Sequence, residues 1–287
     1  MDVTVLVMTY NHAPYIRQAL DSALAQRFDG TMEILVSEDC STDGTREIVQ
    51  EYAERRPDLL RLLLSERNLR SNEVVARGFR AARGRYLALL DGDDFWTDPE
   101  KLQLQADLLD SEPGVALCFH NVEVVGPDTG SERSFWNRAD QPARATLQDL
   151  LAGNFLATSS VMYRRGLVEA LPGWYEDFFP VTDWPLHVFY AEHGEIAYLD
   201  CALGAYRLHE GGWFSGRSEQ EKLRLNADFY RRMRAGSGGR LRRELGRAQR
   251  EYFLGLFAGR CDMAYVEDRL RVVVDAVRAH GRLPKRW

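Results

Sequence analysis

The chain has few cysteines, and none of them lies near another. Cys40, Cys118, Cys201 and Cys261 are the four cysteines among 287 residues, and no two form a Cys-x-x-Cys pair. This spacing argues against a zinc site and against a disulfide framework. Chains without disulfides are typical of reducing compartments, so a cytoplasmic location is the simplest expectation.

Long apolar runs and leader segments are also missing. No run approaches the roughly 20 apolar residues that a membrane span needs. The chain opens directly on the strand-like residues 3–7, with no basic region and no cleavage site before them, so we expect no secretory signal. With 45% apolar and 28% charged residues, the composition is that of a soluble globular protein. The length suits one large domain, or one domain with an appendage.

Charge is unevenly distributed around a net value of -6. From Gly216 onward, 18 Lys and Arg residues stand against 9 Asp and Glu residues. This basic segment either contacts an anionic membrane surface, an acidic acceptor or a second copy of the chain, or is a solvated helical face. The second reading is favoured, because surface charge alone rarely marks a site. We expect no nucleic-acid partner.

Strand and helix patterns alternate along the first hundred residues. Strands are expected over 3–8, 32–37, 59–64 and 85–90. Helices are expected over 13–26, 44–55 and 73–82, the second of them capped by Ser41 or Thr42. This order predicts an α/β fold with a mostly parallel central sheet and helices on both faces.

The later pattern is more mixed. We expect a helix from Pro99 to about Asp110, an exposed or edge strand over 115–125, a strand over 158–164 and a helix over 183–192. Short strands are expected over 196–199 and 205–208, before a loop over 210–217. The remainder is helical in character, with a break at 235–239. The predicted domains are therefore an α/β catalytic domain over 1–215 and a helical extension over 216–287.

Three carboxylates follow the most apolar of these strands. The run 86–90 reads as a buried parallel strand, and it stops at Asp91, Asp93 and Asp94. Ligands bind at this edge of open α/β sheets, and clustered carboxylates suit a hard cation such as Mg²⁺ or Mn²⁺. Asp93 is the first choice as metal ligand, and Asp94 is either a second ligand or an orienting group. Asp91 is expected to accept from ribose hydroxyls or metal-bound water. The alternative is a polar turn that merely ends the strand.

Two other strand ends point to the same edge. Thr9, Tyr10 and Asn11 follow the first strand, where Tyr10 would stack on a nucleobase unless the segment is only a turn. Asp39 follows the second strand, and its carboxylate suits the N3–H of uracil or thymine. Polar residues at three strand ends together indicate a ligand site more specifically than any one of them alone.

Two segments from the later part of the chain complete the candidate site. Asp183 begins a helix and is either a general base for an acceptor hydroxyl or a helix cap; the pattern alone leaves both open. Arg207 and His209 alternate on one face after the last strand, where they would meet phosphate or metal. Their alternative is an ordinary surface turn.

Four motifs occur in the following order along the chain: Val7-Met-Thr-Tyr-Asn-His12, Glu33-Ile-Leu-Val-Ser-Glu-Asp-Cys-Ser-Thr-Asp-Gly-Thr45, Gly84-Arg-Tyr-Leu-Ala-Leu-Leu-Asp-Gly-Asp-Asp94 and Asp183-Trp184. Together they resemble the family 2 glycosyltransferases with the GT-A fold, over about residues 3–215. The resemblance implies an inverting, metal-dependent transfer from a nucleotide-diphosphate sugar, of UDP or dTDP type, to a glycan, lipid-linked, small-molecule or peptide acceptor.

The resemblance also implies roles for individual residues. Tyr10 would line the base pocket and Asp39 would read the base. Asp91 and Asp93 would bind ribose, diphosphate and metal, and Asp183 would be the catalytic base. Segments 118–121 and 206–209 resemble a bacterial subgroup that often builds surface or secondary-metabolite glycans.

One departure from the family pattern concerns the segment before the metal-binding strand. Many members carry Ala-Arg-Asn-x-Gly there, but the Arg and Asn positions fall on Val75 and Ala76. Either Arg70, Asn72, Arg77 or Arg83 takes over their contacts, or the donor differs.

Two rival functions remain. A sugar nucleotidyltransferase would share a similar sheet, but its first loop usually carries Gly and basic residues for a triphosphate, and residues 9–14 have neither Gly nor Lys. The other rival is a non-catalytic nucleotide-sugar binding module, which the intact carboxylates disfavour.

Overall fold

The computed structural model describes residues 1–127, 133–168, 170–212, 214 and 216–257. Contacts divide the chain into two compact units. The first holds residues 1–147 and 155–209, and the second holds residues 148–154 with the segment that begins at 210. A boundary between 215 and 216 stays a prediction, because Ser215 lies outside the described residues. Cys261 also lies outside the described residues. Cys40, Cys118 and Cys201 are free thiols.

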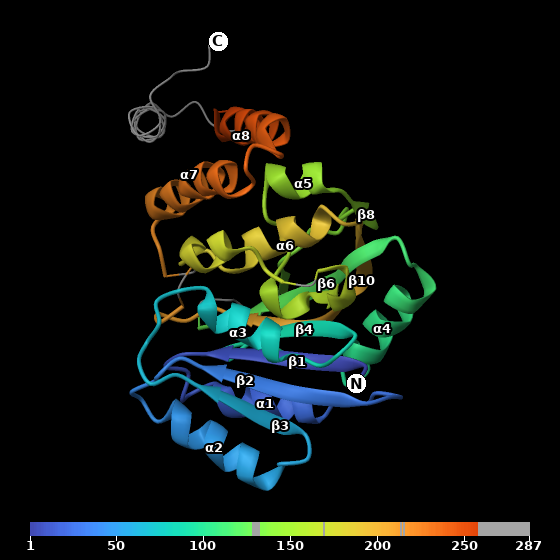
Figure 1. Cartoon of the computed structure of the whole chain (residues 1–287), viewed down its shortest axis with the longest axis vertical. Coiled ribbons are helices and arrows are strands. Elements are labelled where there is room, and N and C mark those ends of the chain that lie inside the picture. The colour runs from blue at the N-terminus through green and yellow to red at the C-terminus, as the bar shows by residue number, and fades with distance from the viewer. Residues whose placement is uncertain (128–132, 169, 213, 215, 258–287) are drawn as a thin grey trace. The chain divides into compact units, whose positions relative to one another are not determined.

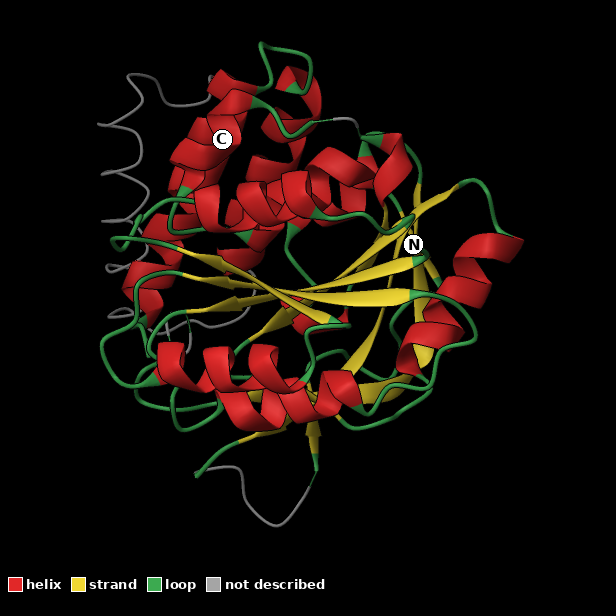
Figure 2. Ribbon diagram, turned by 60° about the horizontal axis from the view of Figure 1, so that its bottom comes forward, coloured by secondary structure: helices red, strands yellow, loops and turns green. Residues whose placement is uncertain are grey.

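The first unit is built on one twisted sheet, and Figures 1 and 2 show its strands and the helices around them. The described strands follow the order β3-β2-β1-β4-β9-β6-β10-β5, with β7 beside β6 and β8 beside β10. Their bounds are β1 Val3–Thr9, β2 Met32–Glu38, β3 Leu60–Leu64, β4 Tyr86–Asp91, β5 Phe95–Trp96, β6 Val115–Val125, β7 Ser134–Phe135, β8 Arg144–Ala145, β9 Met162–Arg164 and β10 Glu195–Arg207.

Helices and short 3-10 turns connect these strands. The helices are α1 Ile16–Leu24, α2 Thr45–Arg55, α3 Glu73–Ala81, α4 Lys101–Ser111, α5 Leu147–Ala152, α6 Asp183–Ala191, α7 Glu219–Gly236 and α8 Arg242–Phe257, and the 3-10 turns are η1 Thr158–Ser160, η2 Arg165–Leu167 and η3 Gly173–Phe178. None of the helices in the described part of the chain has the length and apolarity that crossing a membrane requires.

The half of the sheet made by β3, β2, β1 and β4 is wholly parallel, as the alternating pattern predicted. Side chains of a strand alternate between its two faces. Val5 and Val7 of β1 belong to the core that also holds Ile16 of α1. On the other face, α3 lies so close to β1 that a Cβ at Gly78 would stand 2.4 Å from Leu6 Cδ1. Helices on both faces confirm the α/β class.

The other half of the sheet is mixed, and one strand was placed wrongly. β9 is antiparallel to both β4 and β6, so it joins the parallel half to the rest. β6 was predicted as an exposed or edge strand, but it lies inside the sheet between β9 and β10. Two polar residues of β6 have partners inside the protein. His120 Nδ1 is 2.7 Å from the Asn121 carbonyl oxygen, and the Asn121 side chain bonds both backbone groups of Asn137.

Several element boundaries also differ from the prediction. β10 is one strand rather than two short ones, because shifts of register around Ala202 carry it through residues 200–204. Residues 158–160 form the turn η1 rather than the start of a strand, and the Ser160 hydroxyl donates to the Ala157 carbonyl. α1 begins at Ile16 rather than 13, since the His12 carbonyl first closes a turn with the amides of Tyr15 and Ile16.

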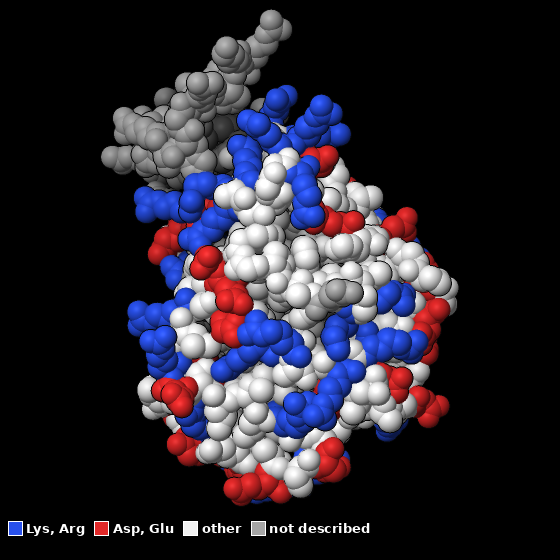
Figure 3. All heavy atoms as spheres, viewed as in Figure 1, with Lys and Arg blue, Asp and Glu red and all other residues white. Residues whose placement is uncertain are grey.

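The second unit contains α7 and α8. Ser218 caps α7 with a full capping box, in which its hydroxyl accepts from the Glu221 amide and the Glu221 carboxylate accepts from the Ser218 amide. α7 ends in the predicted break, where Gly238 and Gly239 have positive φ angles. Figure 3 shows Lys and Arg side chains gathered where Figure 1 draws these two helices, in agreement with the basic sequence.

Lys101, the first residue of α4, is fully buried in the first unit. Its Nζ lies 4.0 Å from the centroid of the Trp96 ring and has no hydrogen-bond partner among the described residues. Burial lowers the pKa of Lys101 to about 7, from 10.5. A buried amine without a carboxylate partner costs stability, because the unfolded chain would hold it solvated and charged.

We expect Lys101→Met to stabilise the protein by about 2 kcal/mol at pH 7, as replacing a buried charge with an apolar side chain often does. Between pH 10.5 and pH 7 the unfolded chain binds a proton at Lys101 and the folded chain does not. The stability of the natural protein therefore falls as the pH is lowered from 10.5 to 7, and the stability advantage of the variant grows in the same direction. Urea unfolding of both proteins at pH 7 and pH 10 measures this.

Leu104→Met on the exposed side of α4 is the matched control and should be neutral at both pH values. An advantage of Lys101→Met that does not depend on pH would contradict the titration of Lys101.

Candidate active site

The carboxyl ends of β1, β2 and β4 lie side by side. Met8 is the register partner of Ser37 on one side and of Asp91 on the other. The residues that follow, Tyr10 and Asp39 among them, therefore leave the sheet at one edge. The three strand-end segments expected to meet are brought together here. Tyr10 is 41% exposed, so its ring is open to a ligand.

Gly92 makes the turn after β4 possible. Its amide donates to the Met8 carbonyl at 2.8 Å, which draws the turn onto β1. A Cβ at Gly92 would lie 2.7 Å from Thr9 Oγ1 and 2.8 Å from His12 Nδ1. A larger residue at position 92 would have to displace these side chains. Glycine therefore allows the turn of residues 91–94, which carries the three carboxylates and is called the carboxylate turn below, to pack against the end of β1.

Asp93 faces two imidazoles. Its Oδ2 is 3.0 Å from His209 Nε2 and 3.6 Å from His12 Nε2, and all three side chains are less than one-fifth exposed. The His209 ring also packs on Tyr15, with ring centroids 4.6 Å apart. Burial lowers the pKa of His12, and the Asp93 carboxylate acts in the opposite direction.

This donor set fits a divalent cation only in part. No group of three or more His, Cys, Asp or Glu side chains in the described chain is arranged to hold a metal by itself. Asp93 offers a carboxylate oxygen, the ligand type that suits Mn²⁺ or Mg²⁺, and His209 offers an imidazole nitrogen beside it. The remaining ligands would come from a bound molecule or from water.

Asp94 and Arg207 connect the turn after β4 to η1 and to the end of β10 by hydrogen bonds. Asp94 accepts from the Arg207 amide at 2.9 Å and from the Ser159 hydroxyl at 2.8 Å, so both its oxygens are used within the protein. Burial raises the pKa of Asp94 to about 8, and the Asp93 carboxylate acts in the same direction. Of the two predicted roles for Asp94, this geometry favours the orienting group.

The Arg207 guanidinium spans three elements. Nε donates to the Asp93 carbonyl at 2.8 Å, and an Nη donates to Gln18 Oε1 at 2.6 Å. The guanidinium also lies about 5 Å from the ring centroids of Tyr15 and Phe95. Arg207 therefore presents its positive charge beside the carboxylate turn.

Asp91 and Asp183 are brought close enough to affect each other. Burial raises the pKa of Asp91 well above its ordinary value, and the carboxylates of Asp93, Asp94 and Asp183 act in the same direction. Asp183 is the first residue of α6, and Thr182 occupies the cap position. The helix-cap reading of Asp183 is therefore not what the structure shows, and its side chain is about one-quarter exposed.

The loop that delivers Asp183 is anchored by Asn72. The side-chain nitrogen of Asn72 donates to the Val181 carbonyl at 3.0 Å, and its side-chain oxygen accepts from the Thr182 hydroxyl at 3.2 Å. The Tyr175 hydroxyl donates to the Thr182 carbonyl at 2.9 Å. The sequence analysis considered Asn72 only as a replacement for the Arg and Asn of the family pattern and did not predict that it anchors this loop.

The other candidate substitutes lie elsewhere. Arg77 is half-buried and donates to the hydroxyls of Ser37 and Ser65 and to the Glu38 carbonyl, so it braces the end of β2. Arg70 is exposed and has a φ of 47°. Arg83 donates through its backbone amide to Thr4 Oγ1 and Glu33 Oε1, near the starts of β1 and β2 and away from their carboxyl ends.

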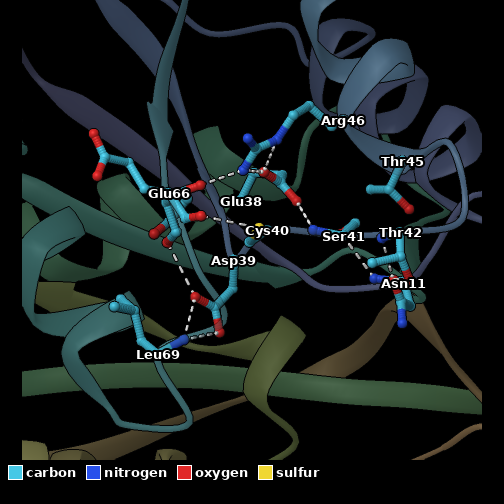
Figure 4. A network of polar contacts seen from close by, with 12 residues as sticks. Asn11, Glu38, Asp39, Cys40, Ser41, Thr42, Thr45, Arg46, Glu66 and Leu69 are labelled. Carbon is cyan, nitrogen blue, oxygen red and sulfur yellow. Dashed lines mark hydrogen bonds and ion pairs between the residues drawn. The ribbon is translucent and has the colours of Figure 1, made fainter.

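Figure 4 shows the network at the ends of β1 and β2. Asp39 is buried, and its carboxylate accepts from the Ser65 hydroxyl and the Leu69 amide. Burial raises the pKa of Asp39, while these hydrogen bonds act against that shift. A carboxylate has further lone pairs, so these contacts still leave Asp39 able to accept from a ligand.

Asn11 ties the two strand ends together. Its amide donates to Ser41 Oγ, and its side-chain oxygen accepts from the Thr42 amide. Ser41 and Thr42 are thus not the helix caps that were predicted. Gly44, with a φ of 98°, holds the cap position, and Asp43 accepts from the Thr45 amide instead. Asn11 and Cys40 both have left-handed φ values, a conformation that is uncommon outside glycine and concentrates at functional sites.

A scan against family models matches residues 4–171 to the model described as Glycosyl transferase family 2. The chain belongs to this family. An uncharacterized protein of Mycobacterium tuberculosis, Rv1520, is 39% identical over 227 residues, which are 77% of this chain and 63% of that protein. The match therefore spans less than two thirds of the length of this curated relative.

Two solved structures share the fold. TarS of S. aureus, in complex with UDP-GlcNAc, superposes with a TM-score of 0.65 at 23% identity, over 97% of this chain and 81% of that one. The mannosyltransferase PcManGT of Pyrobaculum calidifontis, in complex with GDP-Man and Mn²⁺, gives 0.63 at 21% identity, over 98% and 76%. The GT-A fold expected for this family 2 chain is confirmed.

Proposed function

We propose that this family 2 chain is an inverting, metal-dependent glycosyltransferase. It would move a sugar from a nucleotide-diphosphate donor to a hydroxyl of a glycan, lipid-linked, small-molecule or peptide acceptor, in bacterial glycan or glycoconjugate synthesis. The observation that supports this proposal is that Asp183 lies close enough to act on the charge of Asp91, at the carboxyl end of β4 and beside Asp93 in the sequence turn 91–94. A candidate base would then lie beside a candidate diphosphate site.

Asp93 and His209 are the residues that would hold the divalent cation, with diphosphate oxygens completing its ligands. Such a cation offsets the charge of the nucleoside diphosphate as it leaves. Arg207 adds a fixed positive charge at the same place, and Asp94 keeps Arg207 there. Asp91 accepts from ribose hydroxyls, and Thr9 and Asn11 shape the floor and rim of the donor pocket.

The nucleobase would lie at the ends of β1 and β2. Tyr10 supplies an open aromatic face for stacking. Asp39 supplies a buried acceptor at the end of β2, which suits the N3–H of uracil or thymine. UDP- or dTDP-sugars are therefore the favoured donors. The ligand in the TarS structure, UDP-GlcNAc, supports a uridine donor, whereas GDP-Man in PcManGT marks the alternative.

Asp183 would take the proton of the acceptor hydroxyl. The acceptor oxygen forms a bond to the anomeric carbon while the bond from that carbon to the diphosphate oxygen breaks. The proton ends on the Asp183 carboxylate, and the electron pair leaves with the nucleoside diphosphate. One such in-line displacement inverts the anomeric configuration.

Calorimetric titration with UDP, dTDP, GDP and ADP, each with Mn²⁺ and then with a chelator, tests the donor part. We expect metal-dependent binding of UDP or dTDP at least about 10-fold tighter than of GDP or ADP, the value of one good base contact. Equal or metal-independent binding would contradict the roles of Asp39 and Asp93. Turnover of a sugar 1-phosphate with a nucleoside triphosphate would instead favour a nucleotidyltransferase.

A further inference from the structure

His187 lies one helical turn after Asp183 on α6 and is fully buried. Its Nδ1 is 2.6 Å from the Tyr163 hydroxyl, which is also buried. Its Nε2 is 3.9 Å from Asp183 Oδ2 and has no hydrogen-bond partner among the described residues. A buried ring nitrogen beside the candidate base is therefore left just beyond bonding distance.

The contacts of His187 favour one of its two neutral tautomers. Burial raises the pKa of Tyr163 well above its ordinary value, so its hydroxyl keeps its proton and can donate. Burial lowers the pKa of His187 to about 4, so the ring is neutral at neutral pH. A neutral ring that accepts at Nδ1 carries its hydrogen on Nε2. The opposite tautomer would set an Nε2 lone pair toward the Asp183 carboxylate.

A buried N–H without an acceptor is unfavourable, and a carboxylate oxygen lies within about 1 Å of hydrogen-bond distance. A rotation of the Asp183 side chain, which is about one-quarter exposed, would close this gap. Residues at i and i+4 of a helix share one face, so the rotation needs no movement of the backbone.

We propose that His187 is a positioning residue for the candidate base: its Nε2–H binds Asp183 Oδ2 and leaves the other oxygen, Oδ1, to take the acceptor proton. Tyr163 sets the tautomer, and Asn72 sets the start of the helix that carries both residues. This assignment rests on the proposed function, since it gives Asp183 the role of base. It adds a chain of three buried or half-buried groups, Tyr163, His187 and Asp183, to the residues of the site.

Two substitutions at His187 separate positioning from packing. His187→Leu keeps the volume and removes the donor, whereas His187→Gln keeps an N–H that reaches residue i-4 on a helix. We expect His187→Leu to lower kcat by about 10-fold or more, with the KM for the nucleotide sugar unchanged, as for loss of an orienting hydrogen bond. His187→Gln should recover most of kcat, and thermal unfolding reports on packing in both.

Equal losses of kcat in the Leu and Gln variants would overturn the proposal, as would an unchanged kcat in the Leu variant. A loss confined to the KM for the nucleotide sugar would also overturn it. Tyr163→Phe is a second route if His187→Leu does not fold, and it should lower kcat by a smaller factor.

A measurement without turnover separates this inference from the proposed function. In protein labelled with ¹⁵N-histidine, the nitrogen shifts of His187, assigned by their loss in His187→Gln, should show the Nε2–H tautomer. Tyr163→Phe should mix the two tautomers. An Nδ1–H tautomer in the natural protein would overturn the inference. Absence of glycosyl transfer together with the Nε2–H tautomer would count against the proposed function alone.

Discussion

Asp183→Asn is expected to lower glycosyl transfer by about 100-fold or more, the usual contribution of a general base. Asn has nearly the shape of Asp but cannot accept a proton. The anchors of the loop, Asn72 to Val181 and Thr182, involve groups that the substitution leaves intact. Nucleotide binding with Mn²⁺ should therefore stay close to that of the natural protein. Initial rates and calorimetry on the same preparation measure both.

Asp29→Asn is the matched control for this change. Asp29 is exposed and precedes β2, at the opposite edge of the sheet from the candidate site. The control should keep full turnover. If Asp183→Asn also kept it, Asp183 would only be an acidic residue in the first turn of α6, where a negative charge is mildly favourable.

Asp93→Asn is expected to remove the metal-dependent part of nucleotide binding, with a loss of about 100-fold in affinity in the presence of Mn²⁺. The reason is that a charged oxygen is the main protein ligand available to a hard cation here. His209 would keep its position, because Tyr15 packs against its ring. Binding measured with a chelator should be the same in both proteins, and calorimetry with UDP under both conditions tests this.

Asp107→Asn, on the exposed side of α4, controls for the loss of one negative charge. It should bind UDP with Mn²⁺ as the natural protein does. Unchanged affinity of Asp93→Asn for the nucleotide and metal pair would mean that the cation lies elsewhere or is not used.

The sequence was sufficient to predict the part of the fold that repeats a local pattern. An apolar run followed by a polar turn and an amphipathic helix recurs three times before residue 91. Parallel pairing then follows from the connections, and Met8, Ser37 and Asp91 meet in register. The placement of Asp39 and Asp91 at one edge needs no more than this rule.

Contacts between residues far apart in the chain were not predicted. Nothing near Ser159 signals that its hydroxyl binds Asp94, and nothing near Asn72 signals its bonds to Val181 and Thr182. Likewise, β6 was predicted as exposed or edge from its alternating pattern, whereas His120 and Asn121 have hydrogen-bond partners inside the protein. A local sequence pattern predicts the secondary structure of a segment. Hydrogen bonds between distant residues depend on which segments the fold brings together.

The tie between Asp94, Ser159 and Arg207 has a consequence for how such a chain can diverge. One carboxylate holds a turn from the first half of the unit to a 3-10 turn and a strand end from the second half. Loss of Asp94 frees the Ser159 hydroxyl and the Arg207 backbone amide at once, so changes at Asp94 and Ser159 are not independent of one another. Asp94 and Ser159 would therefore be exchanged together, whereas any residue except proline at position 207 supplies the same backbone hydrogen bond.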